Sequence, residues 1–272
     1  MVEQQSAALR FLYQTVPGRW LLRPLVSRSV SKAAGRFLDS RLSRPLIAPF
    51  VRKNSIDLSE FECNFNSFND CFSRKIKAGR RPVVMDPQAL IAPCDGLLSA
   101  FRVEKGTVLA VKQSRYTLDS LLGDPTLAEN YQNGWCLVFR LCVQHYHRYC
   151  YVDGGHKGEN VFLPGKLHTV RPIALAQRPV FIENCREYTV IDSPVFGPMV
   201  QMEVGAMLVG KIQNYAGSGT VVRGAEKGRF LYGGSTIIVL LKEAALRPDI
   251  LKNSADGTET PVKLGERIGA RE

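Results

Sequence analysis

The sequence has 272 residues, of which 45% are hydrophobic and 22% are charged, and its formal net charge is +11. This length and composition predict a folded chain with one sizeable core and exclude a disordered one. The sequence contains no run of about 18 apolar residues, so no transmembrane helix is predicted. Residues 1–10 lack the features of a signal peptide. The seven cysteines contain no CxxC pair, which favours reduced thiols in a cytosolic setting over disulfides or structural zinc.

Residues 1–53 carry most of the positive charge, with ten basic and two acidic residues. Apolar residues recur there at helical spacing: Val30, Ala33, Ala34, Phe37, Leu38 and Leu42, preceded by the patch Trp20, Leu21, Leu22, Leu25 and Val26. An amphipathic helix of this kind either lies on a membrane or caps the protein's own core. The excess of arginine favours a basic membrane-association segment on an anionic surface. Charge alone would also suit nucleic acid, but no recognition motif supports such a partner.

Residues 54–247 predict a catalytic, β-rich domain. A short helix carrying Phe65, Phe68 and Phe72 on one face precedes a loop, and β-rich runs then follow between glycines and prolines at 107–111, 135–143, 200–212 and 236–241. The predicted fold class is therefore α+β, with N-terminal amphipathic helices on a mostly antiparallel β core. Residues 248–272 are polar and predict an exposed C-terminal tail.

Two histidines, His145 and His147, follow the apolar run 137–143. If that strand continues, both share one face, because side chains alternate along a strand. With Cys150 they would form a weak metal signal; the alternative is a histidine hydrogen-bonded in the core. No metal is expected.

Two further motifs contain glycine beside a residue able to do chemistry. Asp95 lies in Pro93-Cys94-Asp95-Gly96, and Ser235 lies in Gly233-Gly234-Ser235-Thr236, just before the apolar run 237–241. In isolation, each motif is typical of a turn, the second leading into a strand.

Taken together and in order, these motifs resemble the phosphatidylserine decarboxylase family. The matching segments run from about residue 60 to 243: Phe65-Asn66-Ser67-Phe68 with Arg74-Lys75 and Arg81-Pro82; Pro93-Cys94-Asp95-Gly96; Tyr146-His147-Arg148; Phe196-Gly197 with Val204-Gly205-Ala206 and Val209-Gly210; and Gly224 to Thr236. The motif Gly233-Gly234-Ser235-Thr236 resembles the motif found in the shorter, second type of this family.

The resemblance implies that Ser235 becomes a covalent pyruvoyl group. Loss of a carboxyl group leaves electrons that none of the twenty side chains can accept, so an electron sink is required. In the implied maturation, the Ser235 hydroxyl attacks the Gly234 carbonyl to give an ester, and elimination and hydrolysis then leave pyruvoyl and ammonia. His147 is the expected base and later acid, Asp95 its orienting carboxylate, and Gly233, Thr236, Tyr146, Arg148, His145 and Cys150 supporting residues.

Two positions depart from the family pattern. His145 stands where Asp is usual, and Cys150 stands where better-known members have the second His of a self-cleavage triad. Either His145 or His147 would then take that role. The resemblance implies a phospholipid substrate, two fragments that stay associated, and a peripheral location on the cytoplasmic side of the membrane. The alternatives are a decarboxylase of a free aromatic amino acid and an uncleaved homologue that only binds lipid.

Overall fold

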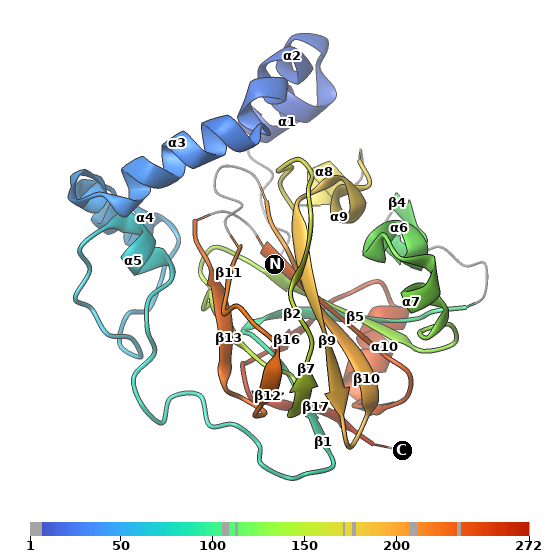
Figure 1. Ribbon diagram of the computed structural model, residues 1–272. Coiled ribbons are helices and arrows are strands. Elements are labelled where there is room, and N and C mark those ends of the chain that lie inside the picture. The colour runs from blue at the N-terminus through green and yellow to red at the C-terminus, as the bar shows by residue number, and fades with distance from the viewer. Residues whose placement is uncertain are drawn as a thin grey trace.

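The computed structural model describes residues 7–104, 109–111, 114–170, 172–175, 178–206, 212–232 and 235–271. Parts of the runs 107–111 and 200–212, together with Gly233 and Gly234, lie outside these ranges. The helices described are α1 (Ala7–Gln14), α2 (Val16–Leu25), α3 (Arg28–Asp39), the 3-10 helix η1 (Arg41–Leu46), α4 (Ile47–Lys53), α5 (Phe68–Phe72), α6 (Leu118–Leu122), α7 (Pro125–Glu129), α8 (Pro172–Leu175), α9 (Val180–Glu183) and α10 (Pro248–Ala255). N-terminal helices precede antiparallel sheets, which confirms the predicted α+β class (Figure 1).

Within the described ranges the strands form one large sheet and three smaller ones. The large sheet has nine strands in the order β12 (Gly219–Val221), β7 (Gly155–Lys157), β9 (Arg186–Ser193), β10 (Gly197–Val204), β14 (Ser235–Leu241), β5 (Trp135–Leu141), β2 (Gly96–Arg102) and β16 (Thr260–Val262), with β8 (Val161–Leu163) beside β9. The smaller sheets contain β1 (Ala89–Ile91), β17 (Arg267–Ala270) and β15 (Ala245–Leu246); β11 (Ile212–Asn214), β13 (Glu226–Phe230) and β6 (Arg148–Cys150); and β3 (Leu109–Val111) with β4 (Ser114–Tyr116).

Strand β14 is buried along its whole length between β10 and β5. Ile238 and Leu240 belong to the core on one face of the sheet, and Ile237 and Val239 belong to the core on the other. Because both faces are covered, the strand is a continuous apolar run without alternation. Its first residue, Ser235, therefore lies at one end of the most protected strand of the sheet.

Different elements cover the two faces of this sheet. Tyr13 and Leu22 of the first two helices and Phe181 of α9 pack over one face. Ile250 of α10 and Ile268 of β17 pack over the other. Segments from both ends of the chain thus complete the core.

The prediction of an exposed tail after residue 248 is wrong. Helix α10 buries Ile250 completely, and the Ser254 hydroxyl accepts a hydrogen bond from the Ala100 amide at 2.9 Å. Strand β16 pairs with β2, and β17 pairs with β1 and β15. Both strands are so short that each contributes only one or two apolar side chains to the core. The composition of the segment therefore stays polar, and no alternating strand pattern is visible in the sequence.

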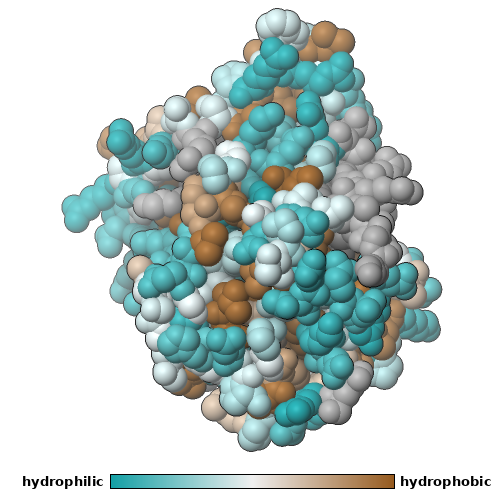
Figure 2. Space-filling model, turned by 45° about the vertical axis from the view of Figure 1, so that its right-hand side comes forward, coloured by the Kyte–Doolittle hydropathy of each residue, from teal (hydrophilic) through white to brown (hydrophobic). Residues whose placement is uncertain are grey.

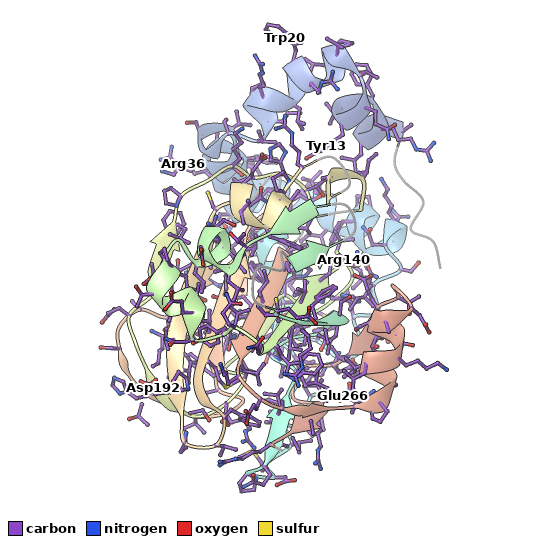
Figure 3. All side chains as sticks on the ribbon, turned by 90° about the vertical axis from the view of Figure 1, so that its right-hand side faces the viewer. Tyr13, Trp20, Arg36, Arg140, Asp192 and Glu266 are labelled. Carbon is purple, nitrogen blue, oxygen red and sulfur yellow. The ribbon has the colours of Figure 1, made fainter. Side chains whose placement is uncertain are left out.

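The N-terminal helices have two apolar faces. The inward face buries Tyr13, Leu22, Val26 and Leu38 against the protein, as the alternative of a cap on the core requires. The outward face leaves large apolar side chains exposed: Phe11, Val16, Trp20, Leu21, Val30, Phe37, Leu42 and Leu46. Trp20 points away from the body and Tyr13 toward it (Figure 3), and the same end of the molecule shows apolar surface among charged groups (Figure 2). No helix in the described ranges is long and apolar enough to cross a bilayer.

Candidate active site

Ser235 is buried at the start of β14, and its Oγ has no hydrogen-bond partner among the described residues. The neighbouring Thr236 Oγ1 is buried and without a partner as well. Buried hydroxyl groups are nearly always hydrogen-bonded, so two adjacent exceptions point to a place where chemistry occurs. The expected cleavage residues Gly233 and Gly234 lie outside the described residues.

The register of the sheet brings the histidines to the same end as Ser235. Ser235 pairs with Leu141, the last residue of β5, and the chain then leaves the sheet. The strand does not continue through His145 and His147, so the condition under which both would share one strand face is not met. A turn forms instead, because the Cys142 amide donates to His145 Nδ1 at 3.0 Å and the His145 amide donates to the Cys142 carbonyl at 2.9 Å.

His147 is completely buried, and its ring lies against Phe72 with centroids 3.9 Å apart. Its Nδ1 lies 2.9 Å from the His145 carbonyl oxygen, which can only accept, so Nδ1 carries the proton. The unprotonated Nε2 has no partner in the described part of the chain. Burial, with a smaller effect of the Arg74 charge, lowers the pKa of His147 well below its usual value of 6.5. The residue is therefore a neutral base with a free lone pair at Nε2.

Arg74, whose role the sequence did not reveal, holds this loop from inside. Its buried guanidinium donates to the carbonyls of Gln144 at 2.7 Å and His145 at 3.1 Å, and it lies over the Phe61 ring. The His145 carbonyl therefore accepts from both Arg74 and His147. An arginine near a phenylalanine-rich helix was the available signal, but the carbonyls that it contacts lie about 70 residues away in sequence.

Asp95 is buried, but its carboxylate is occupied by other groups. Arg81 donates to both oxygens, from Nε at 2.9 Å and from a terminal nitrogen at 2.7 Å, and the Leu264 amide donates at 2.9 Å. Within the described ranges no hydrogen bond joins it to His145 or His147. The carboxylate nevertheless acts on His145, whose pKa is lowered mainly by burial and raised by Asp95. The orienting partner of His147 in this structure is a backbone carbonyl.

The supporting residues Tyr146, Arg148 and Cys150 anchor the loop. Arg148 donates to the Ser73 carbonyl and to Glu226, both at 2.8 Å, and Tyr146 packs near the Phe61 ring. Burial raises the pKa of Cys150 to about 12, so this thiol is not a nucleophile or a base at neutral pH. No three His, Cys, Asp or Glu side chains gather into a possible metal site in the part of the chain that the structure describes.

An aromatic cluster surrounds Tyr232, three residues before Ser235. Tyr232 makes edge-on contacts with Phe68 and Phe72 at centroid distances of 4.9 and 5.1 Å, and Phe50 of α4 joins them. Asn69 links the same elements, since its amide nitrogen donates to Asp39 of α3 at 2.8 Å and its oxygen accepts from the Tyr232 amide at 3.0 Å. The N-terminal helices are thus connected to the residue three positions before Ser235.

Comparison with known proteins identifies the family of the chain. Residues 68–270 match the family model for phosphatidylserine decarboxylase. The chain is 42% identical to phosphatidylserine decarboxylase proenzyme 2 of Clostridium acetobutylicum over 271 residues, which cover 98% of this chain and 93% of that protein. It is also 39% identical to a phosphatidylserine decarboxylase proenzyme of Desulfitobacterium hafniense, covering 97% of this chain and 91% of that protein. The resemblance seen in the motifs is confirmed, and the chain belongs to the phosphatidylserine decarboxylase family.

Proposed function

We propose that this chain is a self-processing decarboxylase that converts phosphatidylserine to phosphatidylethanolamine and CO2. The observation that carries the proposal is that two buried atoms without hydrogen-bond partners in the described residues, Ser235 Oγ and His147 Nε2, belong to segments at the same end of the sheet. Among the described residues Ser235 Oγ has no partner, and the loop that follows β5, the strand paired with Ser235, carries the free Nε2 lone pair of His147. A hydroxyl is a weak nucleophile on its own and needs such a base.

In the proposed maturation, His147 takes the proton of the Ser235 hydroxyl as that oxygen attacks the Gly234 carbonyl. The chain moves from nitrogen to oxygen as an ester, and removal of the Ser235 α-proton then expels the chain ending at Gly234. Hydrolysis of the remaining dehydroalanine releases ammonia and leaves the pyruvoyl group. The buried, unsatisfied Ser235 Oγ fits this conversion. Asp95 contributes through charge, by favouring a proton on His145.

During turnover the pyruvoyl ketone would supply the electron sink for the electrons left by the departing carboxylate. His147 would then deliver a proton to the α-carbon of the substrate. The neutral ring first takes up a solvent proton at Nε2, and its low pKa favours the transfer of that proton to carbon. The apolar surroundings, with Phe72 against the imidazole, disfavour a charged carboxylate and so favour its loss as CO2.

The substrate of this reaction stays in a membrane, and the exposed apolar face of the N-terminal helices suits peripheral attachment there. Trp20 and Leu21 lie on that face, beside the basic residues of 1–53. Each basic residue near an anionic surface contributes about 1 kcal/mol within a Debye length. We place the attachment on the cytoplasmic leaflet, in line with the reduced cysteines.

Intact-mass measurement of the purified protein tests the proposal. We expect two associated fragments, residues 1–234 and 235–272, the second without a free N-terminal amine. Ser235→Ala should abolish both cleavage and decarboxylation, while the matched Ser193→Ala should be cleaved, since the Ser193 hydroxyl is already bonded to Asp153. A single full-length mass for the native chain would leave an uncleaved lipid-binding homologue. If the chain is cleaved but releases CO2 only from free aromatic amino acids, the proposed pyruvoyl reaction stands and the proposed substrate, phosphatidylserine, is wrong.

A further inference from the structure

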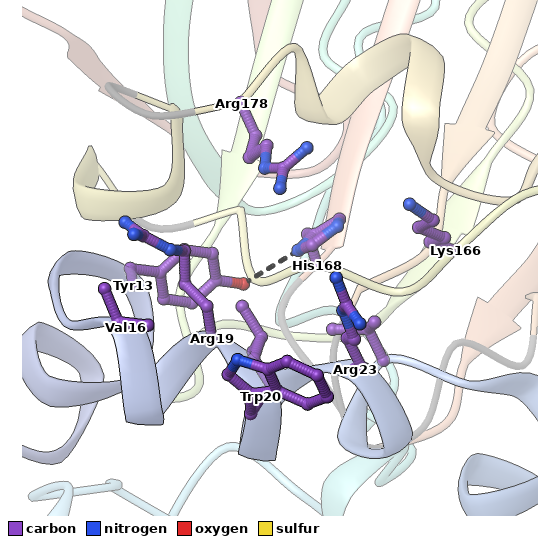
Figure 4. Close-up of a pocket in the computed structure, with 10 residues that line it drawn as sticks. Tyr13, Val16, Arg19, Trp20, Arg23, Lys166, His168 and Arg178 are labelled. Atoms are coloured by element: carbon purple, nitrogen blue, oxygen red, sulfur yellow. Dashed lines mark hydrogen bonds between the residues drawn. The ribbon is translucent and has the colours of Figure 1, made fainter.

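A cavity lies between α2 and the core, and none of its lining residues belongs to the Ser235–His147 site. Its volume is about 670 Å³, and it is lined by Tyr13, Val16, Arg19, Trp20, Leu22, Arg23, Val26, Lys166, His168 and Arg178. This is within the size range of small-molecule sites. Figure 4 shows Arg19 and Arg23 entering from α2 and Arg178 from the opposite side, around His168.

Two distant segments build this cavity. Arg19 and Arg23 are four residues apart on α2 and so share a face, while Lys166 and His168 are two apart in an extended segment. The Leu167 amide joins the segments by donating to the Val26 carbonyl at 3.1 Å. Helix α1 packs so closely on α2 that a Cβ on Gly18 would lie 1.9 Å from the Phe11 carbonyl oxygen. The basic groups are therefore held on a rigid support.

His168 is the buried polar group at the centre of the cavity. The Thr169 amide donates to the Tyr13 hydroxyl at 3.2 Å, and that hydroxyl lies 3.2 Å from His168 Nδ1. The hydroxyl proton goes to Nδ1, and a Glu183 carboxylate oxygen lies 3.3 Å from Nε2, so the imidazole proton resides on Nε2. Glu183 lies at ion-pair distance from Nε2, but within the described ranges no hydrogen bond satisfies this nitrogen. A buried N–H donor without a hydrogen bond thus belongs to the lining of the cavity.

The charge of the cavity is positive. Four cationic side chains line it, and the nearby carboxylate of Glu183 lies 3.6 Å from Arg178. Within the described ranges no acidic side chain pairs with Arg19, Arg23 or Lys166. Arg23 instead lies over the Trp20 ring at 4.8 Å, and Trp20, Val16 and Leu22 supply apolar walls. An anion attached to an apolar body matches both features.

We propose that this cavity binds the phosphodiester head group of an anionic phospholipid. The phosphate oxygens accept from His168 Nε2 and from the cationic side chains, and the glycerol and acyl carbons leave along Trp20 and Leu21. The site adds a defined head-group contact to the diffuse attraction of the basic segment. It rests on the proposed attachment to an anionic membrane and not on the proposed decarboxylation.

Calorimetric titration with short-chain lipids below their micelle concentration tests the site without any measurement of activity. Dihexanoyl phosphatidylglycerol should bind the processed protein saturably, one per chain, and more tightly than zwitterionic dihexanoyl phosphatidylcholine or inorganic phosphate. The triple change Arg19→Gln, Arg23→Gln and Lys166→Gln should weaken binding at least about tenfold, because charged hydrogen bonds are lost. The control Lys32→Gln, Arg36→Gln and Arg41→Gln removes as much charge from the exposed helix surface and should leave this affinity within about twofold.

Trp20 reports where the lipid binds, because it is one of two tryptophans and the other, Trp135, is buried. Lipid should shift the fluorescence of the native protein and not that of Trp20→Phe. Equal weakening by both triple changes, or no saturable binding, would leave diffuse electrostatics as the whole attraction. Inorganic phosphate binding as tightly as the lipid would identify a free-phosphate site and overturn the lipid assignment. Decarboxylation of detergent-dispersed phosphatidylserine, measured separately, reports on the proposed function alone.

Discussion

At the scale of single residues, the environment of His147 determines its chemistry. The carbonyl of His145 accepts a hydrogen bond from Nδ1–H, Arg74 holds that carbonyl in place, and burial keeps the ring neutral. The residue is thereby committed to one tautomer, with Nε2 as the available base. The backbone carbonyl and the burial cannot be read from the identity of any residue in the sequence. Only the third feature, Arg74, is a side chain.

His147→Ala should slow self-cleavage at least about 100-fold, since a positioned general base contributes at least that much. Because burial lowers the pKa in the folded protein, the neutral base persists as pH falls through 6.5 and is lost only below the lowered pKa. The rate of cleavage, followed on denaturing gels from a freshly translated precursor, should therefore stay level between about pH 8 and pH 6.

His156→Ala is the matched control, because His156 is exposed on β7, and it should be cleaved normally. A half-maximal rate near pH 6.5, or normal cleavage of the His147 variant, would remove this residue from the role of base.

At the scale of elements, helices α3 to α5 support the segment that leads into Ser235. The aromatic rings of Phe50, Phe68 and Phe72 surround Tyr232, and Asn69 accepts the hydrogen bond of the Tyr232 amide while donating to Asp39. The helices therefore position the segment before Ser235 in addition to covering the core.

Asn69→Ala should slow self-cleavage by about tenfold and lower the free energy of unfolding by about 1–3 kcal/mol, because the Tyr232 amide loses its buried acceptor. Asp39→Ala removes only the contact to α3, so it should leave the cleavage rate near normal and increase proteolysis of the N-terminal helices. Cleavage half-times and denaturant unfolding distinguish the two variants. Normal cleavage in a destabilised Asn69 variant would show that Asn69 stabilises the fold without positioning the segment.

At the scale of the whole molecule, apolar exposure is concentrated at the end that carries the N-terminal helices. The side chains of Trp20 and Leu21 are 67% and 57% exposed there. Val222 is similarly exposed, at 61%, but it follows β12 at the opposite end of the molecule (Figure 1). Trp20 lines the basic cavity at α2, and the next residue, Leu21, is exposed beside it. The molecule thus has one end suited to a membrane surface.

Trp20→Ser with Leu21→Ser should weaken co-sedimentation with anionic vesicles at least about tenfold, because two large side chains no longer enter the lipid. The free energy of unfolding should change by less than about 0.5 kcal/mol, since both side chains are already exposed. Val222→Ser should leave vesicle binding unchanged, and high salt should weaken binding of the native protein. Equal binding to neutral and anionic vesicles would show that the basic residues play no part in attachment.

The sequence by itself determined the local features of this protein. The glycine pair before Ser235 adjoins the apolar run of β14, and a tyrosine and an arginine flank His147. Each motif spans only a few residues, and local spacing reports such motifs directly. The mixed α+β class followed in the same way, from the change in periodicity after residue 90.

Only the tertiary structure decided the features that depend on segments far apart. It placed Arg81 on Asp95, Arg74 on the His145 carbonyl and Lys166 beside the arginines of α2. It drew the polar C-terminal residues into the sheets and ended β5 before the histidines. The physical reason is that desolvation and hydrogen bonding act between neighbours in space, and a low pKa or an unsatisfied hydroxyl exists only once distant segments have closed around the group.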